Sequence, residues 1–212
     1  MTPNSKNKLK NEMQIRSLQM FAPAPETKRI DSSFYVEGYA ARFEPYVLFE
    51  DADGPIYERF EPGCFDNCDM SDIIFQLNHQ GTVMARQSNG SLIVEVDERG
   101  LFTAADLGRT EAARRLYEEI SAGMITKMSW GFILGDCYYD TDTRTLVHRT
   151  VKKIFDVSAV SIPANNNTEI NARSWADGVI GMAARSEVEL EERRRRLRLK
   201  IKLQEDLSHE NQ

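Results

Sequence analysis

Short runs of alternating apolar and polar residues dominate the chain from residue 34 onward. They are rich in aromatic and β-branched side chains, which favour strands, and they lie at 34–40, 73–77, 92–96, 101–107, 128–134, 146–154 and 157–162. Turn-forming pairs such as Asp53-Gly54, Asn89-Gly90 and Arg99-Gly100 separate them. Many short strands joined by close turns predict an antiparallel sheet or a small barrel rather than repeated strand-helix-strand units.

One segment among these strands has a helical period instead. Its apolar residues fall on a single helical face, namely Ala113, Leu116, Tyr117 and Ile120. Thr110 is a good N-cap, Glu111 suits the positive first turn, and Gly123 is a stop signal. The pattern predicts a helix over 110–121 that packs this face on the sheet.

The two ends of the chain lack the strand pattern. Residues 1–30 are rich in Lys and Asn, contain Ala-Pro-Ala-Pro and have no sustained period, so we expect a flexible leader. The end of the chain is dense in Glu and Arg, with apolar positions that keep no clean heptad, which predicts a charged helical tail over 173–212. A single domain is therefore expected at 31–172.

Charge sharpens this division. The formal net charge is −6, but it is +4 over residues 1–29, −11 over 30–182 and +1 over 183–212. An acidic body argues against a nucleic-acid-binding surface. No apolar run approaches the roughly 18 residues of a membrane span, and the polar start resembles no signal peptide, so we expect a soluble protein made in the cytoplasm, with no membrane partner. The three cysteines suit a reducing compartment.

Three residues are candidates for chemistry. His79 follows a short strand and, on alternation, shares a face with Phe75 and Leu77. Ser129 alternates with the apolar Met128, Trp130 and Phe132, which places it with Gly131 on the opposite face, where the glycine leaves room for another backbone. Asp156 lies in a mainly apolar strand and needs a partner, either a histidine that it orients, an arginine or a backbone amide. Taken singly, each also fits an ordinary structural role.

Two further patterns have other interpretations. The cysteines Cys64, Cys68 and Cys137 together with His79 fit a zinc site loosely, without a second tight pair. The acidic stretch Asp51, Asp53, Glu58 and Glu61 has the wrong order for a calcium loop and is interpreted as solvated surface.

Six segments, in order, resemble the prohead (capsid maturation) serine proteases of tailed bacteriophages, which are relatives of the herpesvirus assembly protease. They include Asn78-His79 and Ser129-Trp130-Gly131-Phe132 and lie at 36–43, 58–65, 77–79, 99–101, 120–132 and 149–164. No single segment is specific, but together they cover about residues 34–170.

The resemblance implies a mainly β fold with some α structure, a small antiparallel β-barrel surrounded by helices as in the herpesvirus protease. It implies Ser129 as the nucleophile and His79 as its base. The family usually has a glutamate at the third position, where this chain has Asp156. The herpesvirus relatives use a second histidine, for which His148 is the candidate, but Asp156 falls on the family's position and is preferred.

The resemblance also implies what the protein does. We expect a serine endopeptidase that needs no metal or cofactor and that cleaves the scaffold, or a scaffolding segment of the major capsid protein, and its own termini. It would work in the host cytoplasm inside the procapsid, and a homo-oligomer is a further expectation. Arg149 and Gly131 are candidate oxyanion or substrate-binding residues. The alternatives are a non-enzymatic capsid assembly factor of the same fold and the zinc-binding structural module.

Overall fold

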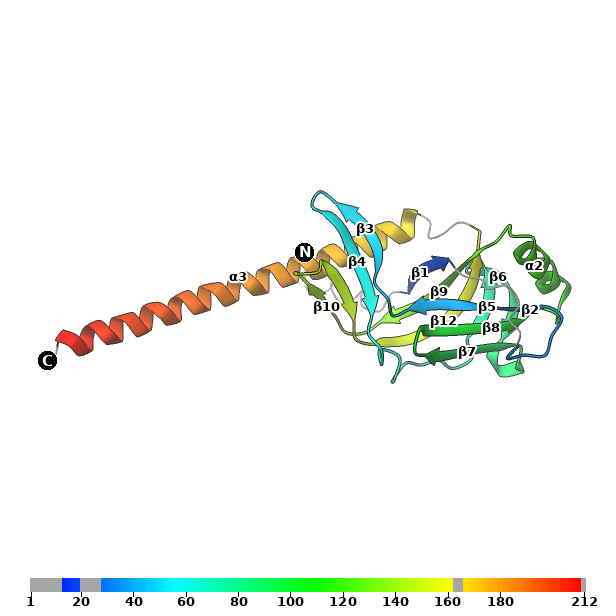
Figure 1. Cartoon of the computed structure of the whole chain (residues 1–212), viewed down its shortest axis with the longest axis horizontal. Coiled ribbons are helices and arrows are strands. Elements are labelled where there is room, and N and C mark those ends of the chain that lie inside the picture. The colour runs from blue at the N-terminus through cyan, green and yellow to red at the C-terminus, as the bar shows by residue number, and fades with distance from the viewer. Residues whose placement is uncertain (1–12, 20–27, 162–165, 211–212) are drawn as a thin grey trace. The chain divides into compact units, whose positions relative to one another are not determined.

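A computed structural model describes residues 13–19, 28–161 and 166–210, and these fall into two compact units divided at Arg173 and Ser174 (Figure 1). The first unit is mainly β. Its elements in chain order are β1 (Gln14–Gln19), β2 (Tyr35–Arg42), β3 (Tyr46–Asp51), β4 (Gly54–Phe60), β5 (Ile74–Leu77), β6 (Gln80–Arg86), a 3-10 turn (Gln87–Asn89), β7 (Leu92–Asp97), β8 (Gly100–Asp106), α2 (Glu111–Ser121), β9 (Lys127–Leu134), β10 (Cys137–Asp140), β11 (Thr145–His148) and β12 (Val151–Val160).

The largest sheet has the strand order β1-β9-β12-β5-β6. Strand β9 pairs antiparallel with β1 on one side and with β12 on the other, and β12 pairs parallel with β5. The face of β9 predicted from alternation is confirmed, because Met128, Trp130 and Phe132 are fully buried. Ser129, on the opposite face, is fully buried as well, so both faces of this strand are covered.

The remaining strands form two further sheets, with the orders β10-β11-β4-β3 and β2-β8-β7. All three sheets are open, and two strand pairs, β12 with β5 and β11 with β4, are parallel. The predicted closed antiparallel barrel is therefore wrong for the described residues, although the mainly β class with helices is right. Alternation identifies strands, but their neighbours are set by contacts between distant segments that a local pattern does not contain.

Two predicted strand boundaries also differ from the structure. The predicted runs at 146–154 and 157–162 leave a gap at residues 155–156, yet the break falls between His148 and Val151, and Asp156 lies within β12, as expected of a residue in a mainly apolar strand. A carboxylate interrupts an apolar run in the sequence, but in the structure it is hydrogen-bonded and does not interrupt the strand.

The predicted helix is confirmed as α2. The Thr110 hydroxyl accepts a hydrogen bond from the Ala113 amide at 3.2 Å, which satisfies one of the free amides of the first turn. Leu116 and Ala113 are buried, and Gly123 follows the helix with a φ of 71°, a left-handed conformation that suits glycine. Within residues 28–161, α2 and the 3-10 turn stand in place of the several surrounding helices that were expected.

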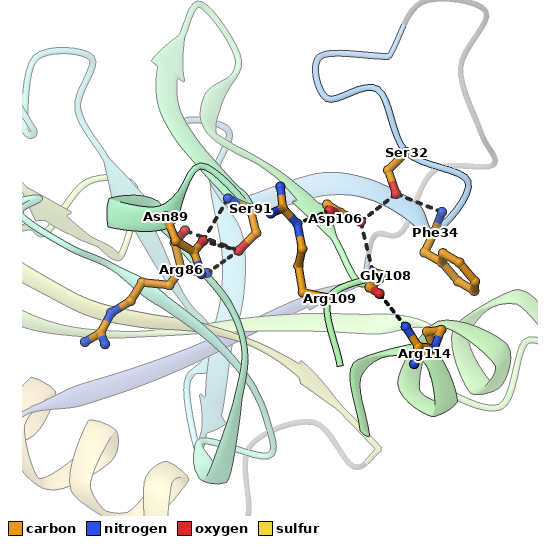
Figure 2. A network of polar contacts seen from close by, with 9 residues as sticks. All are labelled: Ser32, Phe34, Arg86, Asn89, Ser91, Asp106, Gly108, Arg109 and Arg114. Atoms are coloured by element: carbon orange, nitrogen blue, oxygen red, sulfur yellow. Dashed lines mark hydrogen bonds and ion pairs between the residues drawn. The ribbon is translucent and has the colours of Figure 1, made fainter. Parts of the chain in front are cut away.

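A carboxylate at the end of β8 fixes the entry to this helix (Figure 2). Asp106 accepts hydrogen bonds from the Ser32 hydroxyl, the Gly108 amide and the Arg109 side chain. The Arg114 guanidinium reaches back to the Gly108 carbonyl at 2.6 Å. The bonds to Asp106 connect the segment before β2 with the loop before α2. The bond from Arg114 connects the first turn of α2 with the same loop.

The leader contains an element that the sequence did not predict. Residues 14–19 form β1, the end strand of the largest sheet, whereas residues 1–12 and 20–27 of the predicted flexible leader lie outside the described part of the chain. Arg16 in this strand is 4% exposed. Six residues are too few to show a strand period among polar neighbours, so the sequence pattern does not predict this strand.

The described part of the second unit, residues 174–210, belongs to α3, which spans Asn166–Glu210 and contains the predicted helical tail as far as Glu210. Apolar side chains such as Val188, Leu197 and Ile201 are about half exposed. No helix in the described part of the chain combines the length and apolar character needed to cross a membrane.

Candidate active site

Strand register brings three distant residues to the middle of the largest sheet. Ser129 of β9 lies opposite Ser158 of β12, and Gly131 lies opposite Asp156. On the other side of β12, Ala159 pairs with Leu77, the last residue of β5. The residues that follow Leu77, namely Asn78 and His79, therefore lie next to the part of β12 that pairs with Ser129.

His79 lies in the turn between β5 and β6, not on a strand face as expected. Only Asn78 and His79 separate Leu77 from Gln80, and their φ angles are 53° and 56°. Two consecutive left-handed residues are typical of the tight hairpin turn in which asparagine and glycine are favoured. The Asn78 amide donates to the Ala159 carbonyl at 2.9 Å, and the His79 amide donates to the Ser158 hydroxyl at 3.2 Å. These bonds to β12 hold the histidine in a conformation that costs a non-glycine residue energy.

The three side chains form one hydrogen-bonded chain. Nε2 of His79 lies 2.7 Å from Oγ of Ser129, and Nδ1 lies 2.6 Å from Oδ2 of Asp156. An ionised carboxylate only accepts, so Nδ1 carries the proton and donates it to Asp156. In the neutral imidazole, Nε2 is then a free acceptor for the Ser129 hydroxyl. The arrangement can deprotonate Ser129 and hold the resulting imidazolium beside a negative charge.

Asp156 is buried, with a side chain 6% exposed, and its environment explains the neighbouring glycine. Oδ2 accepts from the His79 ring and also from the Ser158 hydroxyl at 2.7 Å, so the buried charge is compensated. A Cβ atom on Gly131 would lie 2.4 Å from Oδ1 of Asp156. Gly131 thus makes room for the carboxylate, and its role beside a bound backbone stays a prediction.

Arg149 makes its described contacts with residues outside this group. Its side chain is exposed with its guanidinium 4.4 Å from the ring centroid of Tyr138, and its amide donates to the Asp136 carbonyl. This position on the β10-β11 side of the fold gives the suggested oxyanion role no support.

His148, the alternative third member, belongs to a second buried cluster. Its Nε2 donates to Oε1 of Glu58 at 2.7 Å, and its ring stacks on Phe60 at 4.5 Å between centroids. Glu58 also accepts from the Arg16 guanidinium at 2.6 and 2.9 Å and from the Tyr46 hydroxyl. Asp156, not His148, is the residue that lies within hydrogen-bond distance of Nδ1 of His79.

The sequence interpretation missed this cluster and placed Glu58 on the solvated surface, whereas its side chain is 0% exposed. A signal was available, because Glu58 lies two residues from Ile56 and two from Phe60 and so shares the face of these core residues of β4. Burial alone would raise the pKa of the Glu58 carboxyl, but the charges and hydrogen bonds of Arg16 and His148 hold that pKa well below its ordinary value. Burial and the Glu58 charge raise the pKa of Tyr46.

The zinc alternative finds no ligand set. The described residues contain no group of three or more His, Cys, Asp or Glu side chains able to hold a metal ion. Burial raises the pKa of the Cys64 thiol to about 12 and that of Cys68 to about 11, so both remain protonated thiols at neutral pH.

Comparisons with known proteins identify the family of the chain. The model of a family described as caudovirus prohead serine protease matches residues 24–179. Among solved structures, the bacteriophage T4 capsid assembly protease, gp21, is similar at 16% sequence identity and a TM-score of 0.44, over 72% of this chain and 100% of that one. No curated protein matches the chain. Since the family model spans most of the chain, the protein belongs to the caudovirus prohead serine protease family.

Proposed function

We propose that the chain is a serine endopeptidase of capsid maturation in which Ser129 is the nucleophile, His79 its general base and Asp156 the group that orients His79. The single observation that supports this assignment is the unbroken chain of hydrogen bonds, 2.7 Å from Ser129 to His79 and 2.6 Å from His79 to Asp156. The same order of hydroxyl, imidazole and carboxylate recurs in serine hydrolases on unrelated folds.

The reaction is acyl transfer to Ser129 followed by hydrolysis. As Oγ attacks a peptide carbonyl, Nε2 of His79 takes the hydroxyl proton and then delivers it to the leaving amine. Asp156 keeps the proton on Nδ1 and stabilises the imidazolium between the two transfers. A water molecule, deprotonated by the same Nε2, then releases the acyl group. The chain's own residues supply every proton transfer in this sequence.

Membership of the family supports the substrates that we propose: the scaffold or a scaffolding segment of the major capsid protein, and the enzyme's own termini. The site of action is then the interior of the procapsid in the host cytoplasm. The −11 charge of residues 30–182 suits an enzyme that should not adhere to DNA. A homo-oligomer and the division into leader, protease domain and tail at residues 30 and 172 belong to the same proposal.

Co-expression with the capsid and scaffold proteins of the same phage tests the proposal. We expect their cleavage with wild type and its loss with Ser129→Ala or with His79→Ala. Persistent cleavage with both variants would refute the mechanism. If wild type cleaves nothing while the capsid still assembles, the alternative of a non-enzymatic assembly factor is the better account.

A further inference from the structure

The segment Gln14–Gln19 lies on the catalytic strand in the way that an extended peptide adds to a sheet edge. Strand β1 pairs antiparallel with β9 over six consecutive positions, from Gln14 opposite Phe132 to Gln19 opposite Lys127. It is the end strand of its sheet, so β9 is its one neighbour there. Strand addition of this kind is a common mode of peptide recognition.

The register of this strand puts one particular peptide bond at the nucleophile. Ser17 is the partner of Ser129 across the pair, and Oγ of Ser129 donates a hydrogen bond to the carbonyl oxygen of Arg16 at 2.8 Å. Nε2 of His79 lies 2.7 Å from the same Oγ, so the single hydroxyl proton can point to either acceptor, and the hydroxyl lies between its base and a peptide carbonyl group. The bond that follows this carbonyl joins Arg16 to Ser17.

The side chain of the same residue enters a site built for its charge. Nε of Arg16 donates to Oε2 of Glu58 and Nη2 donates to Oε1, an interaction that matches the fork of the guanidinium to the two oxygens. Oε2 also accepts from Tyr46, and Oε1 also accepts from His148. With two donors on each oxygen, the buried carboxylate has all of its acceptor positions used.

The site around Glu58 favours arginine over other side chains at position 16 through both its charge and its shape. The Arg16 side chain is 5% exposed, and its guanidinium carbon lies 5.8 Å from the centre of the Phe132 ring. A neutral side chain in its place would leave Glu58 buried with two of its four donors missing. A lysine would keep the charge but lose the paired hydrogen bonds.

We propose that Glu58 determines specificity, that the edge of β9 now paired with β1 takes peptides with an arginine immediately before the scissile bond, and that the chain's own Arg16-Ser17 bond is such a substrate. This inference rests on the proposed function and names the substrate class of the same site. Oγ of Ser129 bonds to the Arg16 carbonyl carbon, and the peptide bond to Ser17 breaks as His79 passes the proton to the new amino group. One water molecule then hydrolyses the ester, which leaves the Arg16 carboxylate and restores the Ser129 hydroxyl.

Intact-mass spectrometry of the full chain tests the internal substrate. We expect wild type to lose residues 1–16 and begin at Ser17, whereas Ser129→Ala and Arg16→Ala keep that bond. Arg29→Ala is the matched control, because this leader arginine pairs with the surface residue Glu95, and the variant should be processed like wild type. An uncut Arg16-Ser17 bond in wild type, or equal cutting in Arg16→Ala, overturns the proposal.

Synthetic peptides that span residues 10–23, with Arg, Lys, Leu or Glu at position 16, test specificity on the processed enzyme. We expect the arginine peptide to be cut at least ~100-fold faster than the leucine peptide, with lysine between them. Equal rates would overturn the role of Glu58. In Glu58→Gln the preference for arginine should be lost, and thermal unfolding checks that this variant folds. If it does not fold, the peptide series on wild type decides alone.

The peptide and capsid assays separate this inference from the proposed function. Cleavage of scaffold or capsid protein that depends on Ser129 but occurs after residues other than arginine refutes the specificity and leaves the protease standing. Absence of any cleavage that depends on Ser129 refutes both.

Discussion

The hydroxyl oxygen of Ser129 lies 2.7 Å from Nε2 of His79, although the two residues are 50 positions apart in the chain. Neither residue belongs to the strand that joins them: Ser129 lies on β9, His79 lies in the turn after β5, and β12 lies between those strands and bonds to both. The contact therefore depends on the register of β12 against two neighbours at once.

Removal of either partner of this contact should abolish turnover. We expect Ser129→Ala and His79→Ala each to lower kcat by about 10³-fold or more, since nucleophile and base act as a unit. Combining the two changes should cost little beyond either one. Initial rates of cleavage of a peptide or capsid substrate give the kcat of each variant. If the decreases in kcat of the two single variants multiply in the double variant, a shared role is contradicted.

Asp156→Asn should leave strand β12 folded and lower kcat strongly. An amide donates a hydrogen bond toward Nδ1 and favours the wrong tautomer of His79, which in a comparable triad lowers kcat by about 10⁴-fold. Asp136→Asn changes an exposed carboxylate and serves as the control, with activity near that of wild type. A small effect of Asp156→Asn would assign the orienting role to another group.

Gly131→Ala should be destabilising because its methyl group would lie 2.4 Å from Oδ1 of Asp156. Displacing the carboxylate or bending β9 should cost about 1–3 kcal/mol of the free energy of unfolding and lower activity as well. The control, Gly178→Ala, meets nothing within 4 Å in α3 and should be neutral or stabilising. Urea denaturation in the Ser129→Ala background avoids self-cleavage, and a fully stable, active Gly131→Ala would disprove this packing.

Acid should remove the contribution that the ionised Glu58 carboxylate makes to the free energy of unfolding. The pKa of Glu58 is lowered in the folded state, so below its unfolded value of about 4.3 the unfolded chain binds the proton first. The stabilisation by Glu58 is therefore fully present above pH ~4.3 and is lost as the pH falls from there toward the lower pKa of the folded state. We expect the free-energy difference between Ser129→Ala and Ser129→Ala/Glu58→Gln to shrink from pH 5 to pH 3. A difference that stays constant would show that the ionised Glu58 has no stabilising contacts.

Thiol reagents should leave the enzyme active. Cys64 is buried, and its pKa is raised to about 12, so almost none of it is thiolate at pH 8. Iodoacetamide at pH 8 should modify Cys64 in urea and not in the native protein, as followed by peptide mass mapping. Native modification of Cys64 that also stops turnover would implicate a cysteine in the reaction.

Local chemistry made part of this structure predictable. The helix after Thr110 was predicted because its cap, apolar face and stop signal are adjacent in sequence, and the buried face of β9 follows from strict alternation. His79, Ser129 and Asp156 were selected through the family resemblance, and the structure places them in contact. Strand order, the parallel pairs and the Arg16-Glu58 ion pair join segments far apart, and no local pattern records them.

Strand β1 has a consequence for how the molecule behaves among its copies. It covers the outer side of β9, and an uncovered β9 would present a row of unpaired amides and carbonyls along the edge of a sheet. Such edges are the usual starting points for aggregation between identical chains. The leader strand therefore keeps this edge of β9 from pairing with the edge of a second copy, and a molecule that has lost residues 1–16 should aggregate through it unless a peptide takes the place of β1.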